Sequence, residues 1–175
     1  MKIRPLTLIL LTLLLFAGAL SYVSNGPGPL VNEIVVRKLD AQLPVKEEEI
    51  WGFLWTQFAN KPEEEKFAKL TTEGWQARFH EYEKILVKKA KRKSLDGDSL
   101  EKCLTEIFDS PKDELAYLPV GAYSTVQGTN PVWIVVVKWE ISGPINDGQY
   151  LELGHVRMFA FDARNFKQIG FCTCM

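Results

Sequence analysis

The sequence predicts an α+β domain whose N-terminal helices pack on one face of a C-terminal four-stranded antiparallel meander. Up to Phe108, apolar residues recur at the three- and four-residue spacing of a helix. After Leu118 the pattern changes to an alternation of apolar and polar residues, which is typical of strands. The connections between the later segments are short and polar, which favours antiparallel neighbours. Helices followed by strands in this order indicate an α+β fold.

The first element, residues 1–19, has the organisation of a secretory signal peptide. A basic start with Lys2 and Arg4 precedes a long apolar run, and the small residues from Ala17 to Ala19 suit cleavage after Ala19. The alternative is an uncleaved anchor that extends to about Val23. Both readings predict an extracytoplasmic protein, periplasmic or secreted, because the positive charges stay inside; in the second it is membrane-anchored through its N-terminus.

Residues 20–32 form a linker, in which glycine and proline alternate, and residues 33–175 form a single domain. The apolar piece at 30–39 is compatible with either a strand or a helix. Four helices are then expected, at residues 44–58, 60–70, 72–93 and 99–108. The first of them carries the apolar stripe Ile50, Leu54 and Phe58, with Trp51 and Trp55 beside it.

Four strands are expected after the helices, at residues 120–127, 132–141, 150–161 and 166–174. The strand at 132–141 places Trp133 and Trp139 on one face and is apolar on both faces in its first half. That pattern is typical of a central strand that is partly covered on its second face. Cystatin-like and NTF2-like folds have this order of elements, which is an analogy of architecture and implies no common function.

The composition sets limits on function. The chain has 175 residues, 46 % of them hydrophobic and 25 % charged, with a net charge of −1. These values are ordinary for a globular domain and exclude a disordered chain, a fibrous rod or a polytopic membrane protein. A near-neutral charge also argues against nucleic acid as a partner, since a nucleic-acid-binding domain carries a basic excess.

The three cysteines, Cys103, Cys172 and Cys174, matter because thiols in an exported chain tend to pair. One hypothesis is a structural disulfide from Cys103 to Cys172 or Cys174. A second treats all three as unpaired residues of the core. A third assigns Cys172, Cys174 and Met175 to a thiol-redox or soft-metal site, although a lone Cys-x-Cys is a weak signal.

A ligand site is expected around His155 and Arg157. Strict alternation from Leu151 places both side chains on the apolar face of their strand, where buried polar groups need partners. Together with Trp133 and Trp139 they form the predicted ligand-binding set. The alternative is a bulge at Gly154, which would shift the register and turn His155 or Arg157 toward water.

A run of basic residues ends the helix at 72–93. Favourable interaction with the helix C-terminus and solubility explain it without a ligand. The functional alternative is contact with a membrane surface or an acidic partner. That contact would use Lys88, Lys89, Lys91, Arg92 and Lys93.

No phosphate loop, nucleophile elbow or zinc-protease motif occurs in the sequence. We therefore expect no catalytic residues and no cofactor. The sequence favours a non-catalytic binding module of the cell envelope, with a partner protein or a small apolar ligand bound between helices and sheet. Two alternatives are a small enzyme or redox protein that uses the Cys-x-Cys, and an anchored subunit of an envelope complex.

Overall fold

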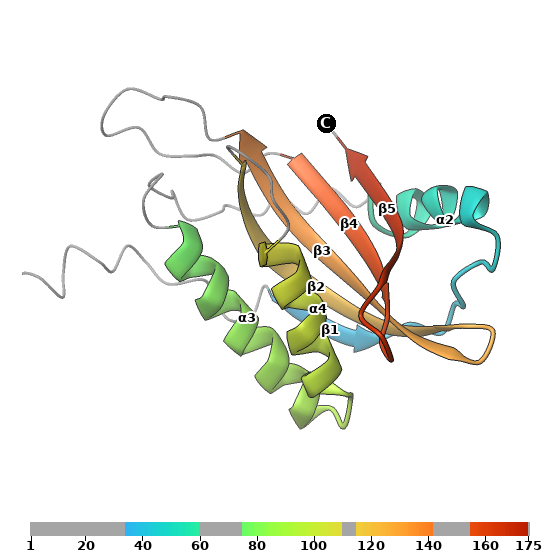
Figure 1. Ribbon diagram of the computed structural model, residues 1–175, viewed down its shortest axis with the longest axis horizontal. Coiled ribbons are helices and arrows are strands. Elements are labelled where there is room, and N and C mark those ends of the chain that lie inside the picture. Colours follow the sequence, from blue (N-terminus) through green and yellow to red (C-terminus); the bar gives the residue numbers. More distant parts are fainter. Residues whose placement is uncertain (1–33, 60–74, 110–114, 142–154, 175) are drawn as a thin grey trace, which may run out of the picture.

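A computed structural model describes residues 34–59, 75–109, 115–141 and 155–174 of the chain, and shows a mixed α+β fold (Figure 1). The helices are α2 (Glu47–Leu54), which continues into the π-helical turn η1 (Trp55–Ala59), α3 (Trp75–Arg92) and α4 (Gly97–Asp109). The strands are β1 (Val35–Lys38), β2 (Leu115–Gln127), β3 (Asn130–Ile141), β4 (His155–Asp162) and β5 (Gln168–Cys174). The predicted signal peptide, its alternative as an anchor, the linker and the predicted helix at 60–70 lie outside the described residues.

The sheet has five strands in the order β1-β2-β3-β4-β5. Strands β2 to β5 are antiparallel neighbours, as the alternating segments predict. The prediction of four strands is incomplete, because β1 from the ambiguous apolar piece pairs in parallel with β2. Strand β2 also begins at Leu115, earlier than expected. A register shift between Pro119 and Gly121 accommodates the proline, which has no N–H to donate.

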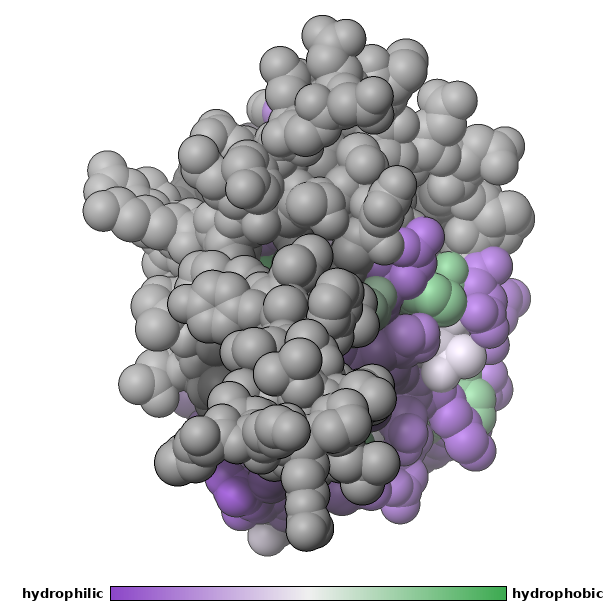
Figure 2. Space-filling model, turned by 90° about the vertical axis from the view of Figure 1, so that its left-hand side faces the viewer, coloured by the Kyte–Doolittle hydropathy of each residue, from purple (hydrophilic) through white to green (hydrophobic). Residues whose placement is uncertain are grey.

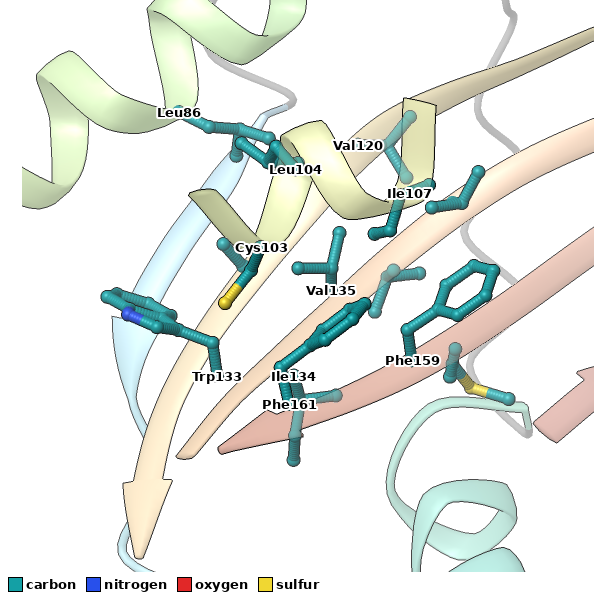
Figure 3. Packing of buried hydrophobic residues seen from close by; sticks show 14 of the residues in the cluster. Leu86, Cys103, Leu104, Ile107, Val120, Trp133, Ile134, Val135, Phe159 and Phe161 are labelled. Carbon is teal, nitrogen blue, oxygen red and sulfur yellow. The ribbon is translucent and has the colours of Figure 1, made fainter. Parts of the chain in front are cut away.

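The helices cover both faces of the sheet, which corrects the prediction that they lie on one face. Helices α3 and α4 cover the face of Trp133, whose indole N–H donates to Ser99 of α4 at 2.8 Å. Helix α2 and η1 cover the opposite face, where the ring of Phe58 lies 4.7 Å from that of Tyr123. Figure 3 shows α4 and α2 on opposite sides of the strands.

The apolar residues on both faces of β3 explain why helices cover both faces of the sheet. Ile134 and Val136 are buried on the α2 face, while Trp133 and Val135 are buried on the α3–α4 face. A strand that is apolar on both faces loses stability if either face meets water, so a second helical cover is favoured. The predicted partial covering of the second face is confirmed.

Two lysines at the C-terminal end of α3 donate hydrogen bonds to the backbone at β1. Lys89 Nζ donates to the carbonyl oxygen of Ile34 at 2.5 Å, and Lys93 Nζ donates to that of Val36 at 2.7 Å. These two carbonyl groups are two residues apart on the side of β1 that faces away from β2.

The described helices include none that is both long enough and apolar enough to cross a lipid bilayer.

Candidate functional site

Five residues form what we call the sheet-face cluster: Trp139 on β3, His155 and Arg157 on β4, and Phe171 and Thr173 on β5. Cross-strand pairing places Trp139 opposite His155, and Arg157 opposite Thr173. Side chains opposite each other in antiparallel strands lie on one face of the sheet. The alternation predicted for this strand is therefore confirmed over the described residues 155–161, while Gly154 lies outside them.

The alternative of a shifted register was based on a bulge at Gly154, which the described residues do not include. The side chains of Met158 and Ala160 point to the opposite face of the sheet from Arg157. They are also fully buried, because α2 covers that face. His155 and Arg157 are half-buried on the other face. Both sets of β4 side chains are thus sheltered, and the register between β3 and β4 is unbroken from His155 to Asp162; a register shift lies on the other side of β4, against β5, between Ala160 and Phe161.

Aromatic rings flank the guanidinium of Arg157. Its Cζ atom lies 4.3 Å from the centre of the Trp139 ring and 5.4 Å from that of Phe171. The His155 ring lies 5.0 Å from the Trp139 ring and is inclined to it by 37°. Burial lowers the pKa of Arg157 from its ordinary value. Since that ordinary value is so high, the group stays charged at neutral pH.

Three polar atoms of the cluster are buried without a hydrogen-bond partner among the described residues: Trp139 Nε1, Arg157 Nε and Thr173 Oγ1. Trp139 as a whole is 6 % exposed, so its indole N–H is not turned to solvent. A buried polar group without a partner costs about 1–3 kcal/mol. All three groups can donate a hydrogen bond.

The structure does not bring Trp133 to this cluster, although it lies on the same face. Trp133 pairs with Phe161, six residues before Trp139 on β3, and is 2 % exposed beneath α4. Its indole N–H is already bonded to Ser99. The alternation of β3 shows which face Trp133 occupies, but not that α4 covers that part of the face. Trp133 therefore belongs to the core.

The predicted disulfide from Cys103 is not formed, because Cys103 is a free, buried thiol. Cys103 lies on α4 and points toward the sheet beside Trp133 (Figure 3). Cys172 is paired with Met158 on β4 and so faces the opposite, α2 side of the sheet. The sheet itself thus separates Cys103 from Cys172.

The redox and metal hypothesis for Cys172, Cys174 and Met175 stays a prediction. Cys172 is 1 % exposed, and the side chain of Cys174 and the whole of Met175 lie outside the described residues. Within the described part of the chain, no group of three or more histidine, cysteine or acidic residues could hold a metal ion.

Burial of Cys103 and Tyr117 makes the free energy of unfolding depend on pH in the alkaline range. It raises the pKa of the Cys103 thiol from 9.0 to about 12 and that of Tyr117 from 10.0 to about 12. The unfolded chain then loses these protons before the folded one does, so stability present below pH 9 is lost as the pH rises toward 12. We expect urea titrations to show a loss of about 1–2 kcal/mol between pH 8 and 10.5. Cys103→Ala should flatten this slope, and an unchanged slope would contradict the assignment.

The basic run has two environments. Lys89 and Lys93 bind backbone carbonyls of β1, and Lys91 forms an ion pair with Asp98 at 2.6 Å. Lys88 and Arg92 are exposed and have no ion-pair partner among the described residues. Both line a groove of about 600 Å³ along α3 and α4. Its walls are Glu83, Lys84, Val87, Lys88, Lys91, Arg92 and Glu101.

A second hollow, which we call the α2–β5 pocket, has a volume of about 520 Å³. Three large hydrophobic residues of the described chain are exposed, namely Val45, Trp51 and Phe171, and all three line this pocket. The other lining residues are Glu47, Ile50, Gln127, Lys167, Gln168, Ile169 and Gly170. On the side of the molecule in Figure 2, in contrast, the described residues are mostly hydrophilic and the hydrophobic ones form small separate patches.

Comparison of this chain with protein-family models, with curated proteins and with solved structures finds no match.

Proposed function

We propose that this protein is a non-catalytic binding module that acts outside the cytoplasm, and that its sheet-face cluster binds the carboxylate of a small apolar molecule. The observation that carries the proposal is the set of three buried donors on Trp139, Arg157 and Thr173, which have no hydrogen-bond partner in the described part of the chain. The extracytoplasmic location rests on the residue pattern of the N-terminal segment.

The chemistry of the cluster favours a carboxylate. A guanidinium presents its N–H groups in a planar fork that matches the two oxygens of a carboxylate. The Nε of Arg157 is one edge of that fork and lacks a partner in the described part of the chain. The indole N–H of Trp139 and the hydroxyl of Thr173 supply further donors. An apolar ligand body would contact the rings of Trp139 and Phe171.

The same residues support binding rather than catalysis. Arginine, tryptophan and threonine hold an anion by donating hydrogen bonds, and at neutral pH none of them readily exchanges a proton with a substrate. The remaining polar member, His155, lies with its ring 5.0 Å from that of Trp139 and inclined to it by 37°.

Titration with octanoate, followed by tryptophan fluorescence and calorimetry, tests the proposal. We expect saturable binding of octanoate and much weaker binding of 1-octanol, which has the same chain without the charge. Arg157→Met keeps the apolar stem but removes the fork, and should weaken octanoate binding at least tenfold, since a hydrogen bond to a charged group contributes about 1.5–3 kcal/mol.

Arg37→Met is the matched control. The Arg37 guanidinium also lies over an aromatic ring, that of Tyr123 at 5.2 Å, but the residue is exposed on the α2 face of the sheet. This variant should bind octanoate like the parent protein. Equal binding of octanoate by the Arg157 variant and the parent would contradict the proposal, as would equal binding of 1-octanol.

We also propose that the exposed end of the basic run contacts an anionic membrane surface or an acidic partner. Lys89, Lys91 and Lys93 are occupied within the molecule, which leaves Lys88 and Arg92 as the cations that support this contact. Glu83 and Glu101 line the same groove and weaken its positive charge.

We also propose that the fold resembles a cystatin-like or NTF2-like arrangement. A cystatin-like or NTF2-like arrangement is supported by α3 and α4 on one face of antiparallel strands. The parallel strand β1 and the helix α2 on the opposite face depart from that simple plan.

A further inference from the structure

The two edges of the sheet differ in their charged side chains and in whether their outer backbone groups are occupied. At the β1 edge, Lys89 and Lys93 occupy the carbonyl groups of Ile34 and Val36, and β1 itself carries Arg37 and Lys38. Charged side chains and occupied backbone groups are the devices by which proteins prevent further strands from pairing with an edge. The β1 edge is therefore protected.

The β5 edge has neither charged side chains nor occupied backbone groups of this kind among the described residues; a register shift against β4 is confined to the start of the strand, between Gln168 and Gly170. Its sequence, Gln168–Cys174, contains neither a charged residue nor a proline, and β4 is its one neighbour in the described sheet. Both backbone groups of Asp162 bond toward the β5 side, with Lys167 and Phe166. Because amide groups alternate in direction along antiparallel strands, we infer that those of Phe171 and Thr173 point to the open edge.

Exposed apolar side chains lie along this same edge. Val45 is 77 % exposed, Trp51 52 % and Phe171 39 %, and together they surround the α2–β5 pocket. Figure 1 shows α2 next to β5 at this end of the sheet. A strand whose outer edge has no neighbour in the described sheet, next to an exposed apolar patch, is a surface for strand addition.

We propose that β5 pairs antiparallel with the β5 strand of a second copy of this chain, so that the two sheets become continuous. An isologous contact requires a surface that is complementary to itself. Strand β5 meets this condition because it brings no like charges opposite each other. The pocket carries one acidic residue, Glu47, and one basic residue, Lys167, so a two-fold rotation can bring opposite charges together. This inference is independent of the proposed function.

The oligomeric state of the purified full chain tests the inference, by light scattering after size-exclusion chromatography and by sedimentation. We expect a dimer of twice the 19.9 kDa chain mass. Trp51→Lys and Val45→Lys place a charge in the apolar rim without touching the sheet-face cluster. Each should raise the dimer dissociation constant at least tenfold and leave the far-ultraviolet circular dichroism unchanged.

Hydrogen exchange adds a readout at the backbone. The amides of Phe171 and Thr173, which point to the open edge, should exchange at least tenfold faster in the Trp51 variant than in the parent, whereas those of β3 should not change. Arg37→Glu, a charge change at the protected β1 edge, is the control and should remain dimeric. A monomeric parent protein, or a dimer that survives both rim substitutions, would overturn the inference.

Discussion

Replacing Trp133 by alanine is expected to lower the free energy of unfolding by about 3–5 kcal/mol, the usual range for removing a buried tryptophan. Trp133 is 2 % exposed and lies between α4 and the sheet, where its indole N–H bonds to Ser99. Alanine would leave a cavity under α4 and remove that bond. Urea denaturation followed by circular dichroism measures the loss.

Trp51→Ala, compared with the parent at protein concentrations at which both are monomeric, is the matched control, because Trp51 is 52 % exposed and its ring stacks on that of Trp55. Its effect should stay within about 1 kcal/mol, as for most surface substitutions. A cycle of Trp133→Phe and Ser99→Ala separates packing from the hydrogen bond, whose net contribution should be about 1 kcal/mol. Equal losses from the Trp133 and Trp51 substitutions would show that Trp133 is not a core residue.

Gly170→Ala is expected to destabilise the fold by about 1–3 kcal/mol, the range for forcing an extra group into a packed core. A Cβ atom at this position would clash with Cγ2 of Ile50. Ile50 is 2 % exposed on α2, and a β-branched side chain in a helix has one strongly preferred rotamer. Helix α2 would therefore have to move away from β5. Urea denaturation measures the cost.

Gly52→Ala in the same helix is the control. A Cβ atom at Gly52 meets nothing within 4 Å, so alanine should stabilise the helix by up to about 1 kcal/mol through its better helix propensity. The cost of Gly170→Ala should also shrink in an Ile50→Ala background, which removes the clashing methyl group. A cost that is the same in both backgrounds would contradict the proposed contact.

Part of the candidate site is visible in the sequence. Alternation along 150–161 places His155 and Arg157 on one face, and the structure confirms this for the described residues. Phe171 and Thr173 were missed because their approach to Arg157 depends on the register between β4 and β5. Their own alternation with Gly170 and Cys172 was a signal that could have identified them.

Two of the predictions depended on contacts between separate elements. The Cys103 disulfide and the inclusion of Trp133 in the site both assumed which surfaces meet across the sheet. The apolar stripe of a helix shows that the helix is buried on one side, but not which face of the sheet it covers. The basic run is similar, since its composition does not reveal that Lys89 and Lys93 reach the carbonyl groups of β1.

The sequence by itself determined the types of most described elements, their order and the two-sided burial of β3, because periodicity within a segment records which of its sides are buried. The tertiary structure decided that β1 joins the sheet in parallel, that α2 covers the face opposite α4, and that Trp139, Arg157 and Thr173 meet. These features depend on contacts between residues far apart in the chain, and no local spacing encodes such contacts.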